Sequence, residues 1–95
     1  MLVELFNIIE DRMANPVEGS YTNHLLAVGE DEILKKIGEE AVEVILAAKA
    51  QGNPRLVEEL ADLFYHSLVL LAARGLTLSE VEAELARRHE SGSRC

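Results

Sequence analysis

The sequence predicts an all-α protein, a four-helix bundle-type subunit. Leu, Ala, Val and Glu dominate its 95 residues, and the composition is 48% hydrophobic but only 4% aromatic, which is typical of helices. Apolar residues recur at spacings of three and four, and Gly, Pro and Asn interrupt the pattern at intervals. We therefore predict a single domain over residues 1–90, followed by a disordered polar tail over residues 91–95.

The first helix is predicted over residues 2–13, where Leu2, Leu5 and Ile9 belong to one apolar stripe. Asn15 and Pro16 stop it, because proline disfavours helical backbone in the residue before it. The following stretch, residues 17–29, is expected to be mainly loop. A short helical turn is expected within it, over residues 22–26.

The second helix is predicted over residues 31–50, and Gly52 is expected to end it in a left-handed cap. Its apolar residues repeat at spacings of three and four, as in the seam of a helical bundle. They are Leu34, Ile37, Ala41, Val44 and Ala48.

The third helix has a clear start signal, with Asn53 predicted as its N-cap and Pro54 at its first position. It is expected to run to Arg74, and Gly75 closes it. Short turns on either side of a long helix favour antiparallel neighbours, which is the arrangement of a helical bundle.

The fourth helix is predicted to begin with a capping box. Thr77 would accept a hydrogen bond from the backbone of Glu80, and the Glu80 carboxylate would reach back to the backbone of Thr77. The helix is expected to continue to about His89.

The third helix also carries a line of polar residues on an otherwise apolar surface. Between residues 60 and 73 nearly every side is apolar, so we expect burial in the subunit or against a partner. Glu59, Asp62 and His66 nevertheless share one face at spacings of three and four. Burying an unpaired carboxylate costs several kcal/mol. The polar line must therefore be paired, solvated in a cleft or bound to a metal.

The second helix supplies a matching acidic group, Glu39, Glu40 and Glu43. At a rise of 1.5 Å per residue, Glu43 lies about 13 Å before the turn between the two helices and Asp62 about 13 Å after it. If the helices fold back on each other, the acidic groups meet at one height. An exposed row of glutamates is also typical of a solvated helix face, so the prediction rests on the combined pattern.

Several carboxylates at one point would repel one another, and a hard divalent cation relieves that repulsion. Ligands that are all oxygen favour Mg²⁺, or Mn²⁺, over Zn²⁺. The sequence therefore predicts an acidic metal site between the second and third helices.

The formal net charge of −8 argues against nucleic acid and anionic membranes as partners. Cys95 is the only cysteine, no apolar run reaches membrane-spanning length, and no targeting segment is apparent. We expect a cytoplasmic protein. A homodimer is also expected, because four short helices cover the apolar third helix poorly, and the active cleft would then draw residues from both subunits.

The acidic pattern resembles the signature of the MazG-like, all-α nucleoside triphosphate pyrophosphohydrolase superfamily. That signature is Glu39-Glu40-x-x-Glu43 followed by Glu59-x-x-Asp62. Within the superfamily, the chain looks like the phosphoribosyl-ATP pyrophosphohydrolase family. The supporting stretches are residues 20–22, 35–43, 59–66 and 74–78.

The resemblance implies Mg²⁺-dependent hydrolysis of phosphoribosyl-ATP to phosphoribosyl-AMP and pyrophosphate, the second step of histidine biosynthesis. It implies Glu40, Glu43, Glu59 and Asp62 as metal ligands, with Glu39, Glu43 and Asp62 as catalytic residues. Glu39 would be an auxiliary carboxylate that orients water or a second ion.

The residues expected to bind the phosphorylated nucleotide are Lys35, Lys36, Tyr21, His66 and Arg88. Each also has a structural interpretation. The lysines could be solvated, and Tyr21 lies where a capped short helix explains the sequence nearly as well. His66 could be a hydrogen-bonded core histidine, and Arg88 suits the dipole of a last helical turn.

Three other functions were compared with the sequence, and the di-iron alternative is disfavoured. A house-cleaning nucleotide pyrophosphatase shares the acidic motif. A di-iron bundle needs Glu-x-x-His pairs, which this sequence lacks. A non-catalytic helical interaction module would explain the apolar third helix but would leave Asp62 and His66 without a purpose.

Overall fold

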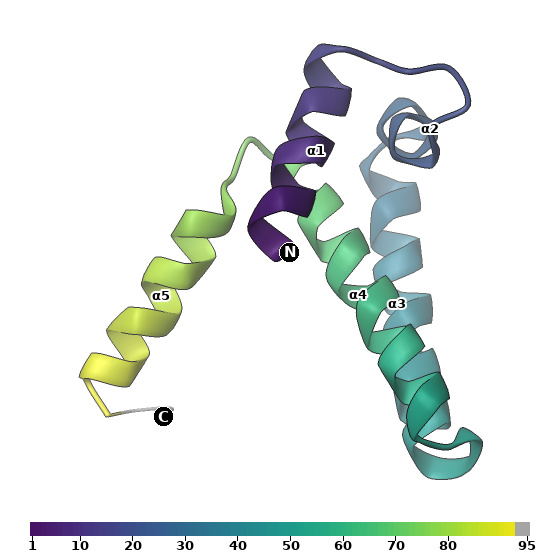
Figure 1. The fold of residues 1–95 in the computed structure, drawn as a ribbon, viewed down its shortest axis with the longest axis vertical. Coiled ribbons are helices and arrows are strands. Elements are labelled where there is room, and N and C mark those ends of the chain that lie inside the picture. The colour runs from purple at the N-terminus through teal and green to yellow at the C-terminus, as the bar shows by residue number, and fades with distance from the viewer. Residues whose placement is uncertain (93–95) are drawn as a thin grey trace.

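The computed structural model describes residues 1–92, and these residues form α-helices joined by short connections (Figure 1). The part of the chain so described contains no β-strand, which confirms the predicted all-α class. The elements are α1 (Leu2–Ala14), α2 (Tyr21–Val28), α3 (Glu30–Leu46), the π-helical segment η1 (Ala47–Gln51), α4 (Asn53–Ala73) and α5 (Leu78–Glu90).

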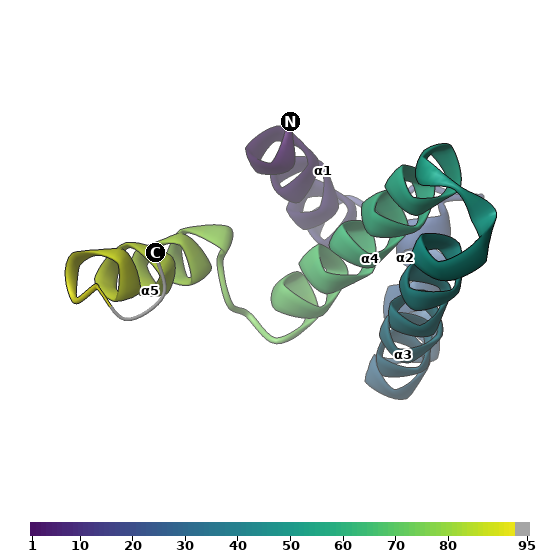
Figure 2. The same ribbon diagram turned by 90° about the horizontal axis from the view of Figure 1, so that it is seen from below.

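Helices α3 and α4 form the antiparallel hairpin that the sequence predicts, with η1 extending α3 to the turn (Figures 1 and 2). The predicted caps at this turn are wrong. Gly52 has φ 87° and ψ 164°, which is a positive φ with extended ψ and not a left-handed helical cap. Because Gly52 reverses the chain, Asn53 is already helical and Gly52 is the N-cap. The Gly52 carbonyl accepts the amide of Leu56 at 3.1 Å.

Helix α2 is longer than the single turn predicted within a loop. Ser20 caps it by accepting the backbone amide of Asn23. The Asn23 side chain also accepts the Val17 amide at 2.9 Å and donates to the Arg12 carbonyl at 2.7 Å. These bonds satisfy backbone groups of the α1–α2 connection. They stabilise the eight-residue helix α2, although its few apolar residues give only a weak helical pattern in the sequence.

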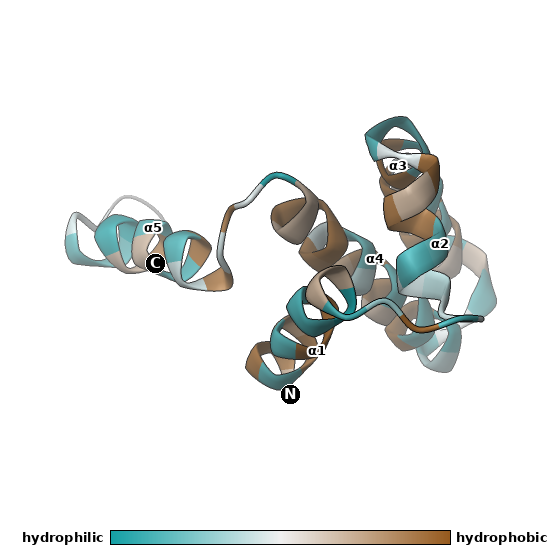
Figure 3. Cartoon of the chain, turned by 90° about the horizontal axis from the view of Figure 1, so that it is seen from above, coloured by the Kyte–Doolittle hydropathy of each residue, from teal (hydrophilic) through white to brown (hydrophobic). Residues whose placement is uncertain are grey.

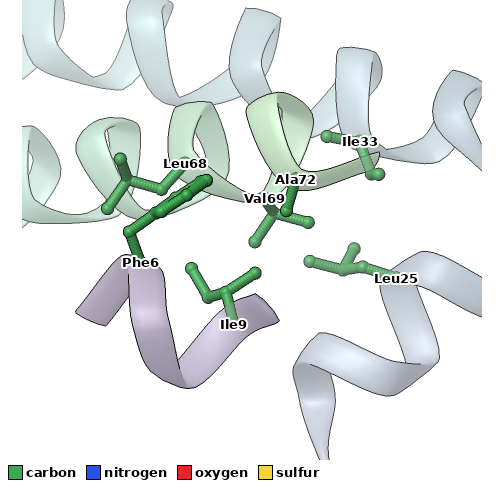
Figure 4. Close-up of a cluster of buried hydrophobic side chains, with 7 residues drawn as sticks. All are labelled: Phe6, Ile9, Leu25, Ile33, Leu68, Val69 and Ala72. Atoms are coloured by element: carbon green, nitrogen blue, oxygen red, sulfur yellow. The ribbon is translucent and has the colours of Figure 1, made fainter. Parts of the chain in front are cut away.

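The core lies where α1, α2 and α3 meet the C-terminal half of α4 (Figure 4). Val69 is fully buried at its centre, and Leu25 and Ile33 reach it from α2 and α3. Each such side chain contributes roughly 1.5–3 kcal/mol on burial. The buried cluster comprises Phe6, Ile9, Leu25, Ile33, Leu68, Val69 and Ala72.

Helix α5 stands apart from the other helices (Figures 1 and 2). It begins at the predicted capping box, with Thr77 accepting the Glu80 amide and the Glu80 carboxylate accepting the Thr77 amide. It has no buried residue, and Val81 and Leu85 are exposed. The bundle that encloses the core therefore consists of α1 to α4, and α5 projects from it with an uncovered apolar face.

At the C-terminus, the amides of Ser91 and Gly92 bond to the carbonyls of Arg87 and His89. The remainder of the predicted disordered tail, residues 93–95, lies outside the described residues. None of the helices within residues 1–92 combines the length and the apolar character that crossing a membrane requires. Figure 3 shows apolar residues on α1, α3 and α4, and the C-terminal end of α4 is apolar over most of its surface.

Candidate active site

Three carboxylates converge between α3 and α4. Glu40 on α3 and Glu59 and Asp62 on α4 each offer an oxygen within 4.8 Å of the other two. The two α4 residues share a face because they are three apart, and the antiparallel hairpin brings Glu40 opposite them. Three of the four predicted metal ligands therefore form one group.

Glu59 is the most buried of the three, with 2% of its surface exposed. Its Oε1 forms an ion pair with the guanidinium of Arg55 at 2.7 Å, and the same guanidinium donates a hydrogen bond to Glu58 at 2.9 Å. A buried carboxylate without a partner would be strongly destabilising, and this ion pair offsets the cost of burying Glu59.

Glu40 shows the electrostatic strain of the cluster most clearly. Burial, a hydrogen bond with Glu59 and the negative charge of Asp62 raise the pKa of Glu40 from 4.5 to about 7, against a small opposing effect of Lys36. At neutral pH the Glu40 carboxyl is therefore partly protonated. A divalent cation would replace that proton, and a set of oxygen donors alone fits Mg²⁺ or Mn²⁺.

The three carboxylates line an open groove of about 740 Å³, within the size range of small-molecule sites. Leu34 and Val42 contribute apolar surface to it, and Lys35 a positive charge. The groove therefore combines acidic, basic and apolar walls, as a site for a phosphorylated nucleotide with a bound cation would require.

Glu39 and Glu43 line the same groove but lie outside the three-carboxylate group. Glu39 forms ion pairs with Lys35 at 3.9 Å and with Lys36 at 3.7 Å. Glu43 lies nearer the hairpin turn, on the side of Arg55. Both can act as auxiliary carboxylates, and the two predicted phosphate-binding lysines are adjacent to the site.

His66 lies in a separate polar cluster beneath α2. It is 5% exposed, its Nδ1 donates to the Asp62 carbonyl at 2.8 Å, and its Nε2 accepts from the Tyr21 hydroxyl at 3.0 Å. A second bond joins Thr22 and Tyr65 between the same two helices. With both ring nitrogens occupied, His66 has the geometry of a hydrogen-bonded core histidine, and it ties α2 to α4.

Tyr21 lies at the boundary of the two clusters. Burial raises the pKa of its hydroxyl, with Lys36 opposing and Tyr65 and Glu40 adding to the effect. The hydroxyl is therefore a neutral donor at ordinary pH. Tyr21 remains 46% exposed and is the part of this cluster that a ligand could touch.

Arg88 is far from this groove within the subunit. It lies on α5, where its guanidinium donates to Glu84 at 3.1 Å, and α5 stands apart from the α3–α4 hairpin (Figure 1). Arg55, by contrast, lines the groove although the sequence analysis did not predict it as a site residue. Its position four residues before Glu59 was the available signal, because side chains four apart on a helix are neighbours.

Comparison with known proteins identifies the family of this chain. The sequence matches the family described as phosphoribosyl-ATP pyrophosphohydrolase over residues 2–89. The phosphoribosyl-ATP pyrophosphatase of Clostridium acetobutylicum is 50% identical over 95% of this chain and 82% of that protein. That of Lacticaseibacillus casei is 51% identical over the same shares. The histidine biosynthesis bifunctional protein of Oceanobacillus iheyensis is 53% identical over 85% of this chain and 38% of that protein. The chain belongs to the phosphoribosyl-ATP pyrophosphohydrolase family.

Proposed function

We propose that this protein hydrolyses phosphoribosyl-ATP to phosphoribosyl-AMP and pyrophosphate, the second step of histidine biosynthesis, in the cytoplasm and with Mg²⁺ as its cofactor. The observation that supports this most strongly is the group formed by Glu40, Glu59 and Asp62, whose oxygens lie within 4.8 Å of one another in an open groove. The relatives that share about half of the sequence carry the name of this activity.

Glu40, Glu59 and Asp62 would hold Mg²⁺, and Mn²⁺ would be an acceptable substitute. When bound, the cation would supply positive charge to the triphosphate oxygens and lower the pKa of a nearby water. Glu43 and Glu39 lie along the same wall. We assign them the orientation of the attacking water, with Glu43 the principal residue and Glu39 auxiliary.

The basic residues beside the acidic cluster would bind the phosphate groups. Lys35 lines the groove, and Lys36 lies close enough to Glu40 to oppose the rise in its pKa. Since the protein carries a net charge of −8, these lysines alone would not hold a triphosphate against the surrounding carboxylates. Substrate binding should therefore depend on the divalent cation.

We also propose that the working form is a homodimer that covers the outer face of the α3–α4 hairpin. Large apolar side chains are exposed on this hairpin in the single subunit, and extensive exposed apolar surface usually marks an interface. Sedimentation should give twice the subunit mass, and Phe64→Glu should shift it towards the monomer. The exposed residues outside the groove are Ile45, Leu46, Val57 and Phe64.

The activity is tested by incubating the protein with phosphoribosyl-ATP and, separately, with ATP and deoxynucleoside triphosphates, and by measuring the pyrophosphate released. We expect release from phosphoribosyl-ATP only when Mg²⁺ is present. Equal or faster release from the free nucleotides would instead show a house-cleaning pyrophosphatase. Asp62→Asn serves as the inactive control.

A further inference from the structure

Arg55 is a groove residue without a role in the reaction as described so far. It lies one helical turn before Glu59 on α4, and its guanidinium contacts Glu59 at 2.7 Å and Glu58 at 2.9 Å. The first of these carboxylates is among those assigned to the cation. One positive group of the protein therefore occupies a carboxylate that a divalent cation would also need.

The two ends of this ion pair differ in their surroundings. The Glu59 side chain is 3% exposed, whereas the Arg55 side chain is 47% exposed. Glu59 cannot turn into solvent, and its charge must be neutralised within the groove. Arg55 can swing outward, because its long flexible side chain starts at the rim of the groove.

We propose that Arg55 is the internal counter-ion of the cation site: it neutralises Glu59 in the metal-free protein and releases that carboxylate when a divalent cation binds. The inference rests on the proposed metal site. A guanidinium and a divalent cation on one carboxylate repel each other in a partly buried setting, so the binding of one weakens the binding of the other.

Two consequences follow for the protein. The metal-free hairpin keeps its stability, because Arg55 offsets the repulsion among Glu40, Glu59 and Asp62. Cation binding is weakened in return, since the cation must displace Arg55. The negative coupling between the two positive groups is measurable as a change in metal affinity when Arg55 is neutralised.

The test is calorimetric titration of Mg²⁺ and Mn²⁺ into the full chain and into Arg55→Gln, together with melting curves in a chelator and in saturating Mg²⁺. We expect Arg55→Gln to bind the cation about tenfold more tightly. We also expect it to melt at a lower temperature than the wild type in the chelator, with the difference closing in Mg²⁺.

Two control variants separate displacement from simple loss of charge. Lys36→Gln removes one positive charge that acts on Glu40 without contacting Glu59. Arg74→Gln removes a guanidinium paired with Glu30 at 2.5 Å, outside the groove. In about 0.5 M KCl, long-range charge effects are screened, and only Arg55→Gln should still bind the cation more tightly than the wild type.

The outcomes distinguish this inference from the proposed function. Equal affinities for Arg55→Gln and Lys36→Gln in high salt would overturn the counter-ion proposal while leaving the metal site intact. No heat of binding in the wild type would overturn the metal site itself. If Arg55→Gln folds only with the cation present, that dependence supports the proposal. In that case Arg55→Lys is titrated with the cation, and its affinity for the cation should lie between those of the wild type and Arg55→Gln.

Discussion

Helix α4 carries two buried polar side chains about two turns apart, Glu59 and His66, and their surroundings differ in a way that indicates function. His66 has a partner on each ring nitrogen, at 3.0 and 2.8 Å. Glu59 lies with Glu40 and Asp62 in a group that holds more negative charge than its nearby cations offset, as the raised pKa of Glu40 indicates. The histidine cluster is complete in itself, whereas the acidic cluster keeps an excess of negative charge that the proposed cation would offset.

The difference follows from the chemistry of the two groups. A neutral imidazole is satisfied by one donor and one acceptor, and α2 and α4 provide both within one subunit. Carboxylates are acceptors only, so three of them cannot satisfy one another unless they share protons or a metal ion. We therefore expect substitutions in the acidic cluster to affect chemistry and substitutions in the histidine cluster to affect stability.

The largest expected effect is that of Asp62→Asn. This substitution keeps the shape of the side chain but removes a charge that the cation requires, and turnover of phosphoribosyl-ATP should fall about a hundredfold or more. Asp62 is exposed, so the helical circular dichroism should be unchanged. Glu43→Gln should act in the same direction. Glu82→Gln on α5 is the matched control, and near-normal turnover in both groove variants would show that the acidic cluster is not the active site.

Tyr21→Phe tests the other side of the comparison. The variant leaves the buried Nε2 of His66 without its donor, and an unsatisfied buried group costs about 1–3 kcal/mol of unfolding free energy. Urea unfolding should detect that loss, while Mg²⁺ affinity should stay within about twofold of the wild type, a change of about 0.4 kcal/mol. A fall in Mg²⁺ affinity as large as that of Asp62→Asn would show that the two clusters act as one site.

Much of this arrangement is visible in the sequence because helical spacing fixes which side chains share a face. The stripe on α1, the capping box of α5 and the pairing of Glu59 with Asp62 all follow from local periodicity. The length of the hairpin places the acidic residues of α3 within about one helical turn of the height of Glu59 and Asp62, although Glu43 lies outside their group.

What the sequence could not show depends on contacts between distant segments. Helix α2 is held by bonds from Tyr21 to His66 and from Thr22 to Tyr65, which lie more than forty residues apart. The rotation of α3 about its own axis decides that Glu40, and not Glu43, is the partner of Glu59 and Asp62. The π-helical segment η1 follows directly on α3 before the turn. Spacing alone gives the height of a side chain but not this rotation.

The smallest expected effect that still separates the two clusters is a pH dependence of stability and of Mg²⁺ affinity that arises from the acidic cluster alone. The fold raises the pKa of Glu40 from 4.5 to about 7, so the folded state binds this proton more tightly than the unfolded chain does. In a chelator, the contribution of Glu40 to stability is therefore fully present below pH 4.5 and is lost as the pH rises through 7. Mg²⁺ competes with the same proton, so its affinity should fall up to about tenfold per pH unit below 7.

Calorimetric titrations of Mg²⁺ at several pH values from about 5.5 to about 8 check this prediction. Glu40→Gln should bind Mg²⁺ more weakly than the wild type. Its affinity should also lose most of the pH dependence, because no proton is displaced from that side chain. Tyr21→Phe should keep the wild-type profile, since Tyr21 is a neutral donor throughout this range. An unchanged pH profile in Glu40→Gln would assign the competing proton to another group. A profile altered by Tyr21→Phe would mean that the hydrogen-bonded histidine cluster takes part in the charge balance of the metal site.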